Sequence, residues 1–182
     1  MFRQRSLLFA ALLAVQGVNK TVSANKFTPK VPEDCLKMGF CEDVPDYPTA
    51  HVDNLIKQLG SQIDKYKVQI DATTVLSRNG VEDLCASNHR TIVPMAAPDK
   101  DGQWHYVVNQ KSRPLQSFIV EVCASPGAAC SNVAVFHTGY DASCKQKFIY
   151  RNAPSLGGGG EMVEKQLMFP SSCACQFGQT DA

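Results

Sequence analysis

The sequence predicts an all-β domain held together by disulfides over residues 79–182, preceded by a small region that is partly helical or unfolded. Two observations predict this fold. Eight cysteines, an even number, are spread over a chain of 182 residues, which is typical of a disulfide framework in an oxidising compartment. Several stretches of the C-terminal half also alternate apolar and polar residues, or are rich in β-branched and aromatic side chains, as strands are.

The first 24 residues have the pattern of a secretory signal peptide. Arg3 and Arg5 form a basic start, Leu7–Val15 is an apolar run, and small residues ending at Gly17 or at Ala24 fit a cleavage site. The alternative is a transmembrane helix, but a span needs about 20 apolar residues, and this run is too short. We therefore expect a secreted, extracellular protein with no inserted membrane segment.

The chain has one N-glycosylation sequon, Asn19-Lys20-Thr21. It lies at the end of the leader, so cleavage after Ala24 would remove it. Asn19 is therefore a weak candidate for a glycan in the secreted product.

Residues 25–78 predict a small region with a local cysteine pair, Cys35 and Cys41, followed by one helix. Thr49 fits the N-cap, and apolar residues recur at helical spacing after it, at Val52, Leu55, Ile56, Leu59 and Ile63. A helix without a core of its own buries its apolar stripe on another domain, or the region stays partly unfolded. The sequence leaves both outcomes open.

The polar stretch Ala72–Gly80 predicts an exposed loop. Exposed loops are where proteases cut, and a trypsin-like protease would cut between Arg78 and Asn79. On this stretch alone, an ordinary loop arginine is the simpler interpretation.

Four strands are expected in residues 79–182. In Leu115–Cys123, for example, Phe118 and Val120 point to one face and Ile119 to the other. The consecutive glycines Gly157–Gly160, together with the residues just before them, predict a flexible hairpin loop. The remaining strands are expected at Trp104–Asn109, Cys144–Tyr150 and Glu161–Phe169.

Six cysteines belong to this C-terminal domain, and Cys173-Ala174-Cys175 is the informative detail. Residues i and i+2 of a strand point to the same face, so both sulfurs can bridge to neighbouring strands. Pairing Cys123 with Cys173 and Cys130 with Cys175 would close a small ring that a third bridge, from Cys85 to Cys144, could pass through. The spacing alone does not select this pairing among the alternatives.

Other classes of site have little support in the sequence. The cysteines and histidines do not have zinc-ligand spacing, so no metal or cofactor is expected. A nucleophile elbow is absent, and bridged cysteines are not nucleophiles, so the chain is not expected to be an enzyme. The net charge of +1 gives no reason to expect nucleic acid as a partner.

Taken together, several motifs give the chain a resemblance to the Spätzle family, the neurotrophin-like cystine-knot ligands of Toll receptors in arthropods. The similarity covers about residues 35–177, and the order and spacing of the motifs make it specific. The motifs are Cys35–Glu42 with Tyr47-Pro48, Leu84-Cys85, Ile92-Val93-Pro94, Trp104 with Val107-Val108-Asn109, Gln116 with Glu121–Cys123, Ala129-Cys130, Cys144–Phe148 and Phe169–Cys175.

The resemblance implies paired β-hairpins held by a cystine knot with the bridges Cys85–Cys144, Cys123–Cys173 and Cys130–Cys175. It also implies a pro-domain over residues 25–78 that a trypsin-like serine protease removes by cutting after Arg78. The ligand domain over residues 79–182 would bind the leucine-rich-repeat ectodomain of a Toll receptor. The role would lie in innate immunity, in development or in both.

One departure from the family concerns the dimer. The family often has an extra cysteine that bridges two protomers, and Ser172 stands at that place. A non-covalent homodimer is therefore expected, with apolar side chains at its interface. The candidates for this surface, or for the receptor surface, are Trp104, Tyr106, Phe118, Phe148 and Phe169.

A second class of function is a secreted, disulfide-rich protease inhibitor or an antimicrobial protein. Residues 79–182 hold eight Lys and Arg against nine Asp and Glu, which argues against a cationic membrane-lytic peptide. A secreted hydrolase has no motif in its favour.

Overall fold

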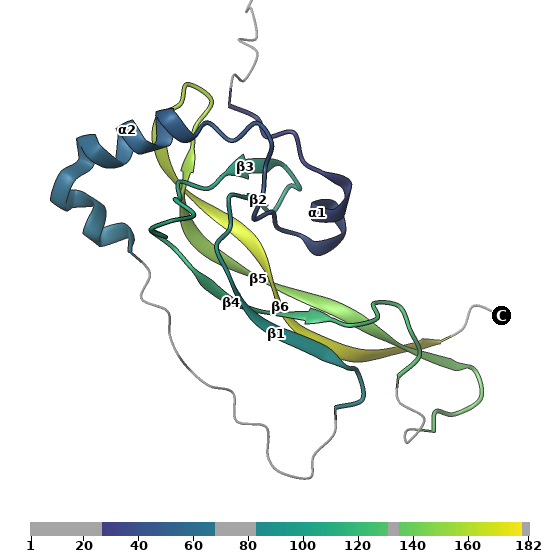
Figure 1. Ribbon diagram of the computed structural model, residues 1–182. Helices are drawn as coiled ribbons and strands as arrows, with labels where there is room; N and C mark the ends of the chain where they lie inside the picture. Colours follow the sequence, from purple (N-terminus) through teal and green to yellow (C-terminus); the bar gives the residue numbers. More distant parts are fainter. Residues whose placement is uncertain (1–26, 68–82, 131–134, 180–182) are drawn as a thin grey trace, which may run out of the picture.

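The computed structural model describes residues 27–67, 83–130 and 135–179 (Figure 1). The expected signal peptide, Asn19, Arg78 and Asn79 lie outside these residues. Within them, no helix combines the length and the hydropathy that crossing a bilayer requires.

Residues 27–67, called the N-terminal segment below, contain three short helices. They are α1 (Glu33–Met38), α2 (Thr49–Leu59) and the 3-10 helix η1 (Gly60–Tyr66). The expected helix is confirmed, but Thr49 is its first residue and not its N-cap, because Pro48 stands at the cap position and makes no side-chain cap hydrogen bond. Helix α1 was not expected, since six residues are too few to show a period.

In its described residues the C-terminal domain consists of three antiparallel two-stranded ribbons, which confirms the all-β prediction. Strand β1 (Ser87–Ile92) pairs with β4 (Phe118–Cys123), and β2 (Ala96–Pro98) pairs with β3 (Trp104–Tyr106). The long strands β5 (Tyr140–Leu156) and β6 (Met162–Gln179) form the hairpin that runs the length of the domain (Figure 1).

Several strand boundaries differ from the prediction. Strand β4 begins at Phe118 and not at Leu115, and β5 and β6 extend beyond the expected Cys144–Tyr150 and Glu161–Phe169. Strand β3 ends at Tyr106, and Val107 adds only a single bridge to Ser155. Residues 153–156, expected in the hairpin loop, belong to β5 and pair with residues 162–165. They are buried, and burial against β6 overrides the weak strand propensity of Ala and Pro. Only Gly157–Gly160 and Glu161 remain for the turn.

The core is shared between the N-terminal segment and the C-terminal domain. One cluster joins Val44, Val52 and Ile63 of the segment to Tyr106 and Leu156. A second cluster places Phe40 among residues of β1, β4 and β6. The apolar stripe of α2 therefore packs on the C-terminal domain, which decides between the two outcomes that the sequence left open.

Candidate functional site

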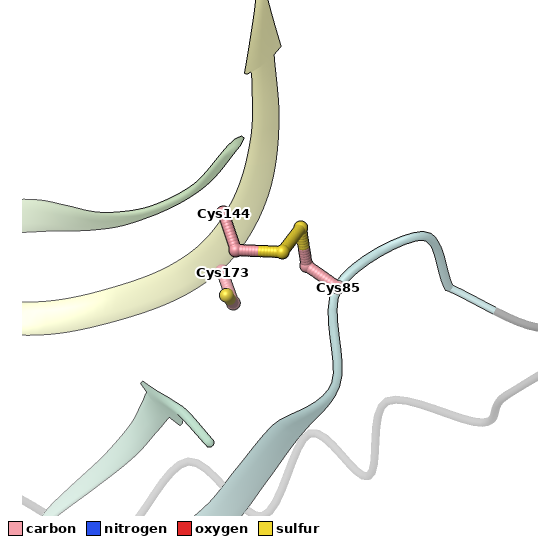
Figure 2. Close-up of side chains that lie close together, drawn as sticks. All are labelled: Cys85, Cys144 and Cys173. Carbon is pink, nitrogen blue, oxygen red and sulfur yellow. A yellow bond between two sulfur atoms is a disulfide. The ribbon is translucent and has the colours of Figure 1, made fainter. Parts of the chain in front are cut away.

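The six cysteines of the C-terminal domain form one compact group of three disulfides. The bridges are Cys85–Cys144, Cys123–Cys173 and Cys130–Cys175, the pairs that the family resemblance implies. The sulfurs of Cys85, Cys144 and Cys173 lie within 4.8 Å of one another, and so do those of Cys85, Cys130 and Cys175. The Cys85–Cys144 bridge therefore touches both other bridges, and Figure 2 shows it beside Cys173.

The strand register brings these sulfurs together. Cys144 of β5 stands directly opposite Cys175 of β6, and Cys173 lies two residues before Cys175 on the same strand. Residues with this relation share one face of a ribbon. The fourth disulfide, Cys35–Cys41, closes a small loop in the N-terminal segment. All eight cysteines are described and none is free, so none of them can act as a metal ligand or a nucleophile.

Two polar side chains that sequence reasoning missed hold β4 to the long hairpin. Gln146 accepts a hydrogen bond from the N–H of Cys123 at 2.8 Å and donates one to the carbonyl of Glu121 at 2.9 Å. The Glu121 carboxylate accepts the N–H of Cys173 at 3.1 Å. Both side chains satisfy backbone groups next to the disulfides. Their position in the family motifs was the one sign of this role in the sequence.

The Cys35–Glu42 loop docks on the C-terminal domain through three consecutive residues. Phe40 is completely buried. Cys41 pairs through its backbone with Met95 and Ala96, at the edge of β2, with its N–H 2.8 Å from the Ala96 carbonyl. The Glu42 carboxylate accepts hydrogen bonds from Arg90 Nη1 at 2.7 Å and from the Val93 N–H at 3.0 Å. Together these residues join the segment to β1 and β2.

Tyr47 forms a second attachment. Its hydroxyl donates to the carbonyl of Val107 at 2.7 Å and accepts the N–H of Asn109 at 3.1 Å. The ring packs edge-on against Tyr106, with 5.7 Å between centroids. Burial raises the pKa of Tyr47, and the nearby Asp53 carboxylate adds to the rise. Burial is also the main cause that raises the pKa of Tyr106.

A third attachment holds the tip of the β5–β6 hairpin. His51 Nε2 lies 2.7 Å from the carbonyl oxygen of Gly160, and its ring stacks on Phe27 at 4.9 Å. Gly160 has a φ of +90°, and a Cβ atom there would lie 2.6 Å from the Phe27 ring. Glycine is therefore needed at this position both for its backbone conformation and for its lack of a side chain.

A cleft of about 380 Å³ runs along the seam between the segment and the C-terminal domain. Its walls are joined by two polar contacts, from Lys111 to Asp43 at 2.9 Å and from Gln110 to Asp53 at 2.6 Å. In the described part of the chain, the clusters of three possible metal ligands consist only of knot cysteines. The two polar contacts make the cleft part of the polar rim between the segment and the C-terminal domain.

Of the five residues expected at a receptor or dimer surface, three are buried in the chain with its N-terminal segment docked. Phe118 and Phe169 are 3% and 1% exposed. Their rings pack together in the core, with 4.7 Å between the centroids. Tyr106 is 3% exposed because the N-terminal segment covers it. Trp104 is half-buried against the same cluster. Phe148, 41% exposed, is the candidate that remains at the surface.

Three comparisons relate this chain to known proteins. A solved structure described as the crystal structure of spatzle cystine knot aligns with 56% of this chain and 99% of its own, at 22% identity and a TM-score of 0.37. Protein spaetzle 5 of Drosophila melanogaster is 35% identical over 97 residues, which is 53% of this chain but only 24% of that relative's length. The sequence model of the Spaetzle family matches residues 82–177. The chain, with its cystine knot of paired β-hairpins, therefore belongs to the Spaetzle family.

Proposed function

We propose that the chain is a secreted, cytokine-like ligand of a Toll receptor and not an enzyme. It would be made as a precursor with a signal peptide over residues 1–24 and a pro-domain over residues 25–78. A trypsin-like protease would activate it by cutting between Arg78 and Asn79, which leaves residues 79–182 as the ligand. Membership of the Spaetzle family supports the ligand role, and the contacts of the N-terminal segment support activation by cleavage.

The observation that carries the proposal is how the N-terminal segment is attached. All eight cysteines are described, and no disulfide joins the segment to the C-terminal domain. The segment is bound by burial and hydrogen bonds, and its covalent connection is the chain over residues 68–82. A short linker holds a docked module at an effective concentration of about millimolar. Cutting it removes that advantage, so the segment becomes able to leave.

Limited proteolysis of the purified chain tests this proposal. A trypsin-like protease should release a resistant fragment that begins at Asn79, and the cleaved chain should bind a Toll ectodomain more tightly than the uncut chain. Arg78→Gln should block both effects, whereas Arg78→Lys, the matched control, should preserve them because such proteases also cut after lysine. Equal receptor binding before and after the cut would refute activation by cleavage.

The ligand is further proposed to act as a non-covalent homodimer. Phe148 and Tyr150 are exposed on one face of β5, two residues apart, and such a pair is suited to a shared apolar interface. Ser172 cannot form the covalent bridge. In analytical ultracentrifugation at neutral pH, the ligand should sediment as a dimer both without reducing agent and after a brief exposure to it. Phe148→Asp should shift the ligand toward the monomer. A wild-type chain that sediments as a monomer at micromolar concentration would contradict the dimer.

A further inference from the structure

The Cys35–Glu42 loop fills a slot on the C-terminal domain whose chemistry is specific. The apolar part of the slot receives Phe40, which packs with Ile92, Ala97 and Phe118. The polar part is the guanidinium of Arg90, which lies 5.1 Å from the centroid of the Phe40 ring and 2.7 Å from the Glu42 carboxylate. One arginine therefore contacts both an aromatic face and an anion.

The backbone of the slot also binds the loop, through specific hydrogen bonds. With the loop in place, the Ala96 carbonyl accepts the Cys41 N–H, and the Met95 and Ala96 N–H groups donate to the Cys41 carbonyl at 2.7 and 3.1 Å. The Val93 N–H donates to the Glu42 carboxylate. Removal of the loop would leave these groups on the open edge of a strand. Such an edge is where an extended peptide from another chain adds to a sheet.

We propose that the Phe40–Glu42 slot is the recognition site for the receptor, and that the receptor fills it with an extended segment of the same chemistry. That segment carries an aromatic side chain and, two residues later, a carboxylate. Residues two apart in a strand point to the same side, so both groups reach the slot while the backbone between them pairs with Ala96. This proposal rests on the proposed function, because it needs the N-terminal segment to leave after cleavage.

The groups that lose their partners when the N-terminal segment leaves favour an occupant of this chemistry over an empty slot. An exposed Arg90 can be solvated by water, but the pocket left by Phe40 borders Ile92 and Phe118, which are buried in the described structure. Once the segment leaves, this apolar surface is exposed to water at a cost that grows with its area, and a bare strand edge invites pairing. A partner that restores the aromatic ring, the strand pairing and the carboxylate together removes all of these costs, which an aliphatic or cationic segment does not.

A synthetic peptide provides the direct test. Residues 33–44, closed by the Cys35–Cys41 disulfide, are added in excess to the cleaved full-length chain. The peptide should displace the N-terminal segment and block binding of a Toll ectodomain. A peptide with Phe40→Ala and Glu42→Gln is the matched control and should do neither. If the native peptide displaced the segment without weakening receptor binding, the receptor would not use this slot, and the proposal would be overturned.

Substitution of the slot itself gives the second arm. Arg90→Ala should weaken both the retention of the N-terminal segment and the binding of the ectodomain, each by about 10- to 100-fold, as expected for loss of a charged hydrogen bond. Lys145→Ala is the control, because Lys145 is an exposed cation of β5 that makes none of the slot contacts. Receptor binding that is unchanged in Arg90→Ala would overturn the proposal.

The two arms separate this proposal from the proposed function. If the cleaved wild-type chain bound no Toll ectodomain, the ligand function itself would fail, and the receptor assignment of the slot would fall with it. If the ectodomain bound but ignored both the peptide and Arg90→Ala, the ligand function would stand and only the slot assignment would be wrong.

Discussion

Removal of one hydroxyl group should loosen the N-terminal segment. Tyr47→Phe keeps the ring against Tyr106 but deletes the group that donates to the Val107 carbonyl and accepts the Asn109 N–H. Val107 and Asn109 are almost completely buried, so their backbone groups would lose a partner that water cannot easily replace. Such a loss costs about 1–3 kcal/mol. The affinity of the cleaved segment should therefore fall about 5- to 150-fold.

The assay compares two variants of the cleaved full-length chain. A fluorescently labelled copy of residues 27–67 competes with the bound segment, and its exchange reports the dissociation constant. Tyr66→Phe is the matched control, since the structure gives the hydroxyl of Tyr66 no hydrogen bond among the described residues. If Tyr47→Phe and Tyr66→Phe held the segment equally well, the hydrogen bonds of Tyr47 would not contribute to docking, and the reasoning would be refuted.

The raised pKa of Tyr47 adds a pH dependence with a defined sign. A free tyrosine has a pKa of 10.0, and burial raises that of docked Tyr47. The docked state thus holds its proton longer, so its stabilisation is complete below pH 10 and is lost as the pH rises toward the folded value. Retention of the segment should weaken above pH 10. The slope should be smaller in Tyr47→Phe but not absent, because Tyr106 shifts in the same direction.

Three further predictions concern the C-terminal domain. Phe118→Ala should lower the free energy of unfolding by about 3–5 kcal/mol and Phe148→Ala by about 1 kcal/mol or less, as measured by urea denaturation; similar losses would contradict the assignment of Phe118 to the core. Replacing both cysteines of the Cys85–Cys144 bridge, 59 residues apart, with serine should cost about 4 kcal/mol by loop entropy, and an unchanged melting temperature would argue against that account. Burial raises the pKa of Asp99, but hydrogen bonds from His105 and from backbone N–H groups lower it more, so the pKa lies below 3.8. The free energy of unfolding should therefore fall as the pH drops through that lower pKa. Asp99→Asn should remove this part of the acid sensitivity.

The expected aromatic surface shows where sequence reasoning was limited. Alternation in Leu115–Cys123 correctly separated Phe118 and Val120 from the exposed Ile119, because the period of a strand is local. Which of the two faces meets protein is not local. The Phe118 face meets Phe169 of β6 and Phe40 of the N-terminal segment, and residues this far apart in sequence leave no mark on each other's spacing.

Strand limits failed for a similar reason. Strand β1 (Ser87–Ile92) is mostly polar, and only Ile92 at its end is buried. Its composition therefore resembles that of a loop. It forms a strand because β4 offers it a complementary edge. The extension of β5 through Pro154 depends likewise on pairing with β6, since local propensity alone disfavours it.

The sequence by itself determined the features that depend on neighbouring residues and that the structure confirms: an all-β cysteine-rich domain, an amphipathic helix and the Gly157–Gly160 turn. The even number of cysteines and the same-face relation of Cys173 and Cys175 favoured disulfide cross-links, which the structure contains. The tertiary structure alone decided what depends on contacts between distant residues. These are the burial of three expected surface aromatics and the docking of the N-terminal segment through Phe40, Glu42 and Tyr47. The burial and the docking depend on contacts between residues far apart in the sequence, and the whole fold decides which of these residues meet.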